Sequence, residues 1–157
     1  MKILFICTAN ICRSALAEAI LRKKLQERGI SDIEVASAGV RNFEGRPRDS
    51  TMVALARQAG YEMGGTARYL TLEEAESADK IICMEQFQKY ELYHRFKVHV
   101  PWKNIYRFNE ICFIETTDLI DPTGDTKDVY NYVFKRIEEG CEKLVRKLIR
   151  EYGGECQ

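Results

Sequence analysis

The segment 7–14, with the sequence CTANICRS, places a thiol six residues before a guanidinium, between an apolar run and a helix-forming stretch. A loop that opens a helix can point backbone N–H groups inward and adds the positive end of the helix dipole, so it can bind a tetrahedral dianion. The same field would hold Cys7 as a thiolate, the nucleophilic form. Arg13 could bind two phosphate oxygens at once, Ser14 could donate to the sulfur, and Asn10 could brace the loop. These residues predict phosphoryl transfer.

In that chemistry the Cys7 thiolate attacks phosphorus in line and forms a cysteinyl-phosphate, which water then hydrolyses. Arg13 and the N–H groups would hold the equatorial oxygens. The leaving oxygen needs a proton, so a carboxylic acid must reach it. Asp118, Asp121 and Asp125 stand close together in the chain, but an Asp-Pro pair such as the one at Asp121 is by itself a common turn. The residues alone leave the choice of acid open.

Alternating strand and helix patterns must position this loop. We expect strands over 2–6, 33–38, 80–84 and, last, 97–102, and helices over 13–28, about 50–59, 86–96 and 126 to about 152, with a short helix after a capping box at Thr71. The stretch 103–119 shows no clear pattern. Such alternation implies an α/β fold with a parallel sheet covered on both faces, where ligands bind beyond the carboxyl ends of the strands. Cys7 follows the first strand and stands at such an end.

Length and composition favour one ordinary globular domain over residues 1–157, with 45% hydrophobic and 31% charged residues. Lys plus Arg and Asp plus Glu both number 24, and this balance argues against a general nucleic-acid binder. No apolar run approaches the roughly 20 residues of a membrane helix, and the apolar start is shorter than a signal-peptide core. We therefore expect a cytoplasmic protein without membrane or nucleic-acid partners.

The six cysteines, at positions 7, 12, 83, 112, 141 and 156, could form disulfides by their even count. In a chain of this length with a good core pattern, reduced cytosolic thiols are the better interpretation. No Cys-x-x-Cys pair and no zinc-type spacing occurs, and His94 and His99 stand apart from the cysteines. We expect no metal and no cofactor.

These motifs resemble the low-molecular-weight protein tyrosine phosphatase family. The similarity rests on the loop 7–14, on Ala17-Glu18-Ala19, Ser37-Ala38-Gly39, the run 78–84 (ADKIICM) and Asp121-Pro122, and it covers most of the chain outside about 102–119. It implies a four-stranded parallel sheet flanked by helices, and hydrolysis of phosphotyrosine on protein substrates. We also expect a monomer or weak dimer.

The resemblance implies roles for matching positions. Cys7 would be the nucleophile, Arg13 the phosphate clamp and Asp121 the general acid. The residues that would bind phosphate or shape its loop are Thr8, Ala9, Asn10, Ile11, Cys12, Ser14 and Ser37. Cys12 would also trap an oxidised Cys7 as a reversible disulfide, which blocks over-oxidation.

The sequence departs from the family pattern at three positions. Ala9 replaces a common glycine, and Ala15 replaces a common proline. A glycine-only backbone angle at position 9 would strain the loop, although we expect alanine to be tolerated. Thr123 replaces the aromatic residue that helps to wall the substrate pocket, so Phe43 and Ile11 would supply two walls. Tyr106 or Phe108 could replace the missing one.

Three alternatives remain open. The chain could be a phosphoarginine phosphatase, although the apolar Ile11 at the mouth suits an aromatic ring better. It could be an arsenate reductase, which needs further thiols to carry the oxidation away, but Cys83 falls in an expected buried strand and Cys112 is far from it in sequence. It could be a binding module for phosphorylated residues, although a binder needs no nucleophile.

Overall fold

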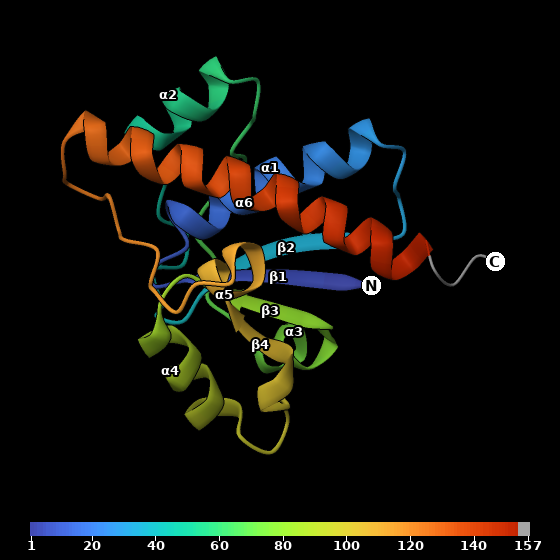
Figure 1. The fold of residues 1–157 in the computed structure, drawn as a ribbon. Coiled ribbons are helices and arrows are strands. Elements are labelled where there is room, and N and C mark those ends of the chain that lie inside the picture. The colour runs from blue at the N-terminus through green and yellow to red at the C-terminus, as the bar shows by residue number, and fades with distance from the viewer. Residues whose placement is uncertain (154–157) are drawn as a thin grey trace.

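The structure, a computed structural model, describes residues 1–153, with no side-chain description for 152 and 153. Its centre is one sheet of four parallel strands in the order β2-β1-β3-β4 (Figure 1). The strands are β1 (Lys2–Cys7), β2 (Glu34–Gly39), β3 (Lys80–Cys83) and β4 (Ile105–Arg107). The four-stranded parallel α/β fold predicted from the sequence is confirmed.

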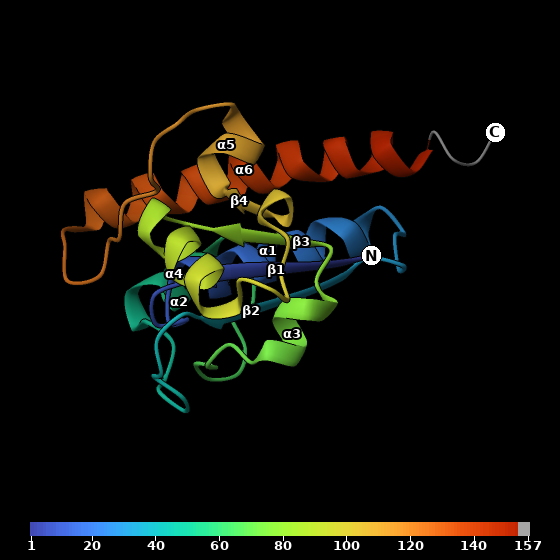
Figure 2. The same cartoon turned by 90° about the horizontal axis from the view of Figure 1, so that it is seen from below.

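Strand β1 is buried on both faces because helices cover both sides of the sheet. Ile3 and Phe5 pack into one hydrophobic cluster, and Leu4 and Ile6 pack into the other, all four with no exposed surface. The first cluster contains residues of α1 (Arg13–Glu27), α2 (Ser50–Gln58), α5 (Phe108–Phe113) and α6 (Lys127–Gly153). The second contains residues of α3 (Leu72–Ser77) and α4 (Gln86–Phe96), and Figure 2 shows α3 and α4 on the side of the sheet opposite α5 and α6.

The last strand lies at Ile105–Arg107, so its expected position at 97–102 is wrong. The backbone nitrogens of His99 and Val100 both donate to the carbonyl of Phe96, which closes a turn directly after α4. Val98 is 87% exposed, whereas Val100 is 2% exposed and packs into the second cluster, and neither lies in a strand of the sheet. A short 3₁₀ helix (Trp102–Asn104) follows before β4 pairs with β3.

Helix α6 carries the predicted apolar stripe. The stripe consists of side chains with no exposed surface on the face toward the sheet, namely Val133, Ile137, Cys141, Leu144 and Leu148. Five of the six cysteines are buried free thiols, and Cys156 lies outside the described residues. None of the helices in residues 1–153 combines the length and apolar character needed to cross a bilayer.

Gly140 lies in the interior of α6, where glycine destabilises a helix by about 1 kcal/mol relative to alanine. A Cβ here would lie 2.4 Å from Cζ of Phe108 and 3.2 Å from Cε2 of Phe113, so the missing side chain lets α5 approach α6. We expect Gly140→Ala to lower the free energy of unfolding in urea by about 1–3 kcal/mol through overpacking. Glu139→Ala, at an exposed position, should change it by less than about 0.5 kcal/mol. A stabilising Gly140→Ala would contradict this packing.

Candidate active site

Cys7 is the last residue of β1, at the carboxyl edge of the sheet, and is 3% exposed. Its Sγ lies 2.9 Å from Oγ of Ser14, and the backbone N–H of Asn10 donates to it at 3.3 Å. Both groups can donate to a negatively charged sulfur, and hydrogen bonds to an ionised partner are the stronger kind. The structure therefore brings together the thiol and the hydroxyl that the sequence pattern predicted to meet.

The loop from Cys7 runs directly into the first turn of α1. Cys12 occupies the N-cap position, no side chain caps the helix there, and the first turn contains no acidic residue. The helix itself therefore places no carboxylate against the positive end of its dipole, which suits the loop to a dianion. Burial raises the pKa of the Cys12 thiol, and the charge of Asp49 adds to the shift. Cys12 accordingly stays a neutral thiol.

Asn10 holds the loop 7–14 in shape. It has a φ of 62°, in the left-handed region that few residues other than glycine enter. Its buried side chain donates from Nδ2 to Oγ of Ser14 and to Oγ of Ser37, both at 2.9 Å. Ala9 lies outside the positive-φ region, so its replacement of glycine imposes no left-handed strain.

Gly39 ends β2 against the backbone of the same loop. A Cβ at this position would lie 2.8 Å from the carbonyl oxygen of Thr8 and 3.0 Å from the carbonyl carbon of Ala9. The next two residues donate backbone N–H groups into the loop, Val40 to the carbonyl of Cys7 and Arg41 to that of Thr8, each at 3.0 Å. A glycine is needed here because the two backbones approach so closely.

Two basic residues that sequence reasoning did not assign to the loop also hold Asn10. Nη1 of Arg48 donates to the carbonyl oxygen of Asn10 and, at 3.0 Å, to its Oδ1. The backbone N–H of Arg68 donates to the same Oδ1 at 2.9 Å. Burial lowers the pKa of Arg48. Arg48 is therefore part of the loop support, and nothing in the local sequence distinguished it from a solvated loop residue.

The guanidinium of Arg13 lies inside the site, with the residue 2% exposed. Nη1 donates to Oε1 of Glu85 at 2.9 Å and to the carbonyl oxygen of Leu119 at 2.5 Å. Glu85 precedes α4, whose buried Gln88 donates at 3.2 Å to the hydroxyl of Thr8. The carboxylate of Glu85 therefore holds Arg13, and the amide of Gln88 holds the loop. Sequence reasoning missed both.

Of the three candidate acids, Asp121 is the one that faces Arg13. Its Oδ2 lies 3.8 Å from Nη2 of Arg13, and its side chain is 50% exposed. Asp118 instead accepts from the backbone N–H of Gln86 at 2.8 Å and pairs with Arg107 at 3.2 Å. Asp125 accepts the N–H of the next residue at 2.8 Å. The geometry thus favours Asp121 over the other two.

The expected pocket walls are only partly in place. Phe43 is half-buried, with the guanidinium of Arg46 stacked 5.0 Å from its ring centroid. Phe108 is buried in the core against Phe5, so its proposed use as a wall is wrong. Tyr106 packs against the same core cluster. Thr123 is exposed and offers no ring. Another aromatic residue, Phe87, lies 39% exposed at the start of α4, next to the residues that hold the clamp and the loop.

The fold and this loop are typical of phosphatases that use a cysteine. A sequence profile described as low molecular weight phosphotyrosine protein phosphatase matches residues 2–153. The low molecular weight protein-tyrosine-phosphatase Etp of Escherichia coli K12 is 31% identical over 153 residues, 95% of each chain. The protein tyrosine phosphatase of Entamoeba histolytica has a similar structure, with a TM-score of 0.86 at 29% identity over 97% of this chain and 99% of that one.

A third similar protein carries a different name. The structure of YwlE arginine phosphatase, as a cysteine-to-serine mutant with a phosphorylated active-site serine, has a TM-score of 0.88 at 26% identity over 94% of this chain and 95% of that one.

Because the sequence profile matches nearly the whole chain and Etp is similar over 95% of it, the chain belongs to the low molecular weight phosphotyrosine protein phosphatase family. Members of this family hydrolyse phosphoric monoesters, so the protein is a phosphatase.

Proposed function

We propose that the protein removes phosphate from phosphotyrosine in proteins, with Cys7 as nucleophile, Arg13 as phosphate clamp and Asp121 as general acid. The observation that carries this proposal is the convergence of three groups at one sheet edge. The Cys7 sulfur is held by Ser14 at 2.9 Å, and Arg13 lies buried between the phosphate loop and the carboxylate of Asp121. The apolar Ile11 in the loop suits an aromatic ring.

The reaction needs two proton transfers through the same carboxyl group. The thiolate attacks phosphorus, the bond from phosphorus to the ester oxygen breaks, and Asp121 gives that oxygen its proton. Water then attacks the cysteinyl-phosphate, Asp121 takes a proton from the water, and the thiolate leaves as phosphate is released. Arg13 and the loop N–H groups stabilise the charge on the equatorial oxygens in both steps. The exposed position of Asp121 gives it access to the leaving group.

Phosphoarginine is the second candidate substrate, because YwlE arginine phosphatase has a similar structure. The apolar side chain of Ile11 favours the aromatic ring of phosphotyrosine over the side chain of phosphoarginine. Arsenate reduction receives less support, because Cys83 and Cys112 are buried, at 0% and 6% exposure, and burial raises the pKa of both thiols. An arsenate reductase must pass the oxidation on to a reductant outside the protein, so its further thiols must be within that reductant's reach.

The direct experiment compares rates on p-nitrophenyl phosphate, a phosphotyrosine peptide and a phosphoarginine peptide, without added metal and with Cys7→Ser in parallel. We expect turnover that depends on Cys7, and a higher kcat/KM on the phosphotyrosine peptide. A higher kcat/KM on the phosphoarginine peptide would show that phosphoarginine, and not phosphotyrosine, is the preferred substrate. No turnover on any of the three would overturn the proposed function.

The role of Asp121 predicts a dependence on the leaving group. Asp121→Asn should lower kcat/KM on phenyl phosphate, which has a poor leaving group, by about 10²–10⁴-fold. The comparison uses kcat/KM because this constant reports phosphoryl transfer to Cys7 and not the later hydrolysis, in which Asp121 acts alike for every ester. The loss on p-nitrophenyl phosphate should be much smaller, because its phenolate leaves without protonation. Asp125→Asn is the matched control, because Asp125 lies in the same turn but its Oδ1 accepts the backbone N–H of Thr126. Equal losses on both esters would show that Asp121 is not the acid.

The remaining assignments are proposals that follow from the same chemistry. The substrates are phosphotyrosine proteins of the cytoplasm, and the enzyme acts as a monomer or weak dimer. Cys12 protects Cys7 by forming a disulfide with an oxidised Cys7. Arg41, Arg46 and Arg48, which stand close to Phe43 in the sequence, attract acidic phosphopeptides.

A further inference from the structure

The phosphate loop and the acid turn belong to different parts of the fold, yet the reaction needs them at a fixed position relative to each other. The loop leads from β1 into α1, whereas Asp121 lies in the turn before α6. The proton of Asp121 must reach an oxygen on a phosphorus held by the loop, and small displacements of such groups are costly to rate. Some contact must therefore set the spacing between the turn and the loop.

Asp49 is joined to the phosphate loop by its backbone. Its N–H donates to the carbonyl of Ile11 at 2.8 Å. Its Oδ1 accepts the N–H of Met52 at 2.8 Å and so caps α2. Its remaining oxygen, Oδ2, accepts the hydroxyl of Tyr130 at 2.8 Å. Asp49 thus connects the loop to the second turn of α6 through a side chain whose position α2 fixes.

The hydroxyl of Tyr130 continues this connection into the acid turn. It accepts the backbone N–H of Gly124 at 3.3 Å. The turn is internally closed, because the N–H of Asp125 donates to the carbonyl of Pro122 at 2.9 Å and the N–H of Thr123 donates to Oδ1 of Asp121 at 3.0 Å. Holding Gly124 therefore holds the carboxyl group of Asp121.

The hydroxyl of Tyr130 must keep its proton to donate to Asp49 while it accepts from Gly124. The residue is 4% exposed, and burial, followed by the hydrogen bond to Asp49, raises the pKa of Tyr130 to about 12. At neutral pH the phenol keeps its proton, donates it to Asp49 and leaves its lone pairs for Gly124. Phenylalanine would fill the same space and make neither bond.

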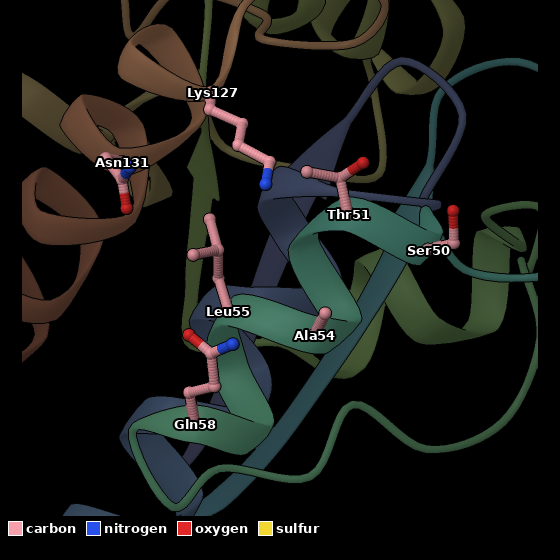
Figure 3. Close-up of a pocket in the computed structure, with 7 residues that line it drawn as sticks. All are labelled: Ser50, Thr51, Ala54, Leu55, Gln58, Lys127 and Asn131. Carbon is pink, nitrogen blue, oxygen red and sulfur yellow. The ribbon is translucent and has the colours of Figure 1, made fainter.

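Helices α2 and α6 are only partly in contact near the acid turn. A hollow of about 520 Å³ lies between α2 and the start of α6. Figure 3 shows the side chains that line it, with Thr51 and Leu55 on α2 and Lys127 and Asn131 on α6. Among the described residues, the bond from Tyr130 to Asp49 is the side-chain hydrogen bond that joins the start of α2 to α6.

We infer that the hydroxyl of Tyr130 is a positioning group that sets the acid turn against the phosphate loop. The inference rests on the proposed function in one respect, because it assigns proton donation to Asp121. Tyr130→Phe should lower kcat/KM on phenyl phosphate, which reports phosphoryl transfer to Cys7, by about tenfold, since one buried hydrogen-bond network is lost. On p-nitrophenyl phosphate the loss should stay within about twofold, because that ester needs no acid.

Tyr61→Phe is the matched control. Tyr61 is also buried, and its hydroxyl donates to a carboxylate of α6, Oε2 of Glu138, at 2.8 Å. Its side chain contacts Glu138, Lys23 and Phe134, none of which belongs to the loop 7–14 or to the acid turn, so its loss should affect the two esters equally and slightly. Equal effects of Tyr130→Phe and Tyr61→Phe on the ratio of the two rates would overturn the inference.

A second readout does not depend on activity. Hydrogen exchange of the Gly124 amide, followed by NMR, should become about tenfold faster in Tyr130→Phe and stay unchanged in Tyr61→Phe. Unchanged exchange in Tyr130→Phe would show that the hydroxyl does not hold the turn. If the wild-type enzyme turns over neither ester, the proposed function fails, while the exchange of Gly124 still decides whether Tyr130 holds the acid turn.

Discussion

Replacing Cys7 by serine is expected to lower kcat on p-nitrophenyl phosphate by at least about 10⁴-fold, because a neutral hydroxyl at this position is a far weaker nucleophile than a thiolate. Arg13 and the N–H groups of the loop remain in this variant, so inorganic phosphate should still bind as a competitive ligand. Turnover is measured by release of nitrophenolate, and binding by calorimetry.

Cys112→Ala is the control for the loss of a thiol as such, since Cys112 is buried in α5, away from the loop. It should keep the wild-type kcat. Substantial turnover by Cys7→Ser would exclude the covalent mechanism. Loss of phosphate binding together with turnover would indicate a damaged loop instead of a missing nucleophile.

Arg13→Lys is expected to show the second largest effect, a fall in kcat of about 10²–10⁴-fold with weaker binding of phosphate. The guanidinium is planar and can hold two oxygens at once, whereas an ammonium is a single point charge. Lysine also cannot reproduce the contacts of Nη1 with Glu85 and with the carbonyl of Leu119 while facing the phosphate.

Arg57→Lys tests whether any arginine-to-lysine change has this consequence. Arg57 pairs with Glu62 on the surface at 3.3 Å, with both side chains largely exposed, so its replacement should leave the kinetics unchanged. Rates for Arg13→Lys within about twofold of the wild type would mean that bidentate binding of the phosphate does not operate here.

The geometry of the loop 7–14 could be predicted because its parts are close in sequence. The thiol, the hydroxyl and the bracing amide of Cys7, Ser14 and Asn10 all lie within eight residues, between a strand and a helix with clear apolar patterns. The parallel sheet followed from the same local alternation. Residues of this kind meet by local geometry, without help from distant segments.

The supports of the site could not be predicted, because they depend on contacts between distant segments. Glu85 meets Arg13 across 72 positions, Tyr130 meets Asp49 across 81, and Arg48 meets Asn10 across 38. Each looked like an ordinary surface charge or core aromatic residue in its own segment. Only packing of the folded chain brings such pairs together.

The misplaced last strand has a related cause. The run 97–102 contains two valines and a tryptophan and resembles a strand, but its backbone closes the end of α4. The true strand has three residues, too few for a pattern of alternation, and α5 follows it at once. The pairing with β3 therefore determines the position of β4, and local propensity does not.

Trapping the covalent intermediate tests the central claim most directly. The enzyme is mixed with a phosphotyrosine peptide, quenched in acid within the first turnover, digested, and analysed by mass spectrometry. We predict a phosphoryl group on the peptide that contains Cys7, appearing with the burst of released tyrosine peptide and disappearing as phosphate forms. Full turnover with no phosphate on Cys7 at any quench time would contradict the mechanism.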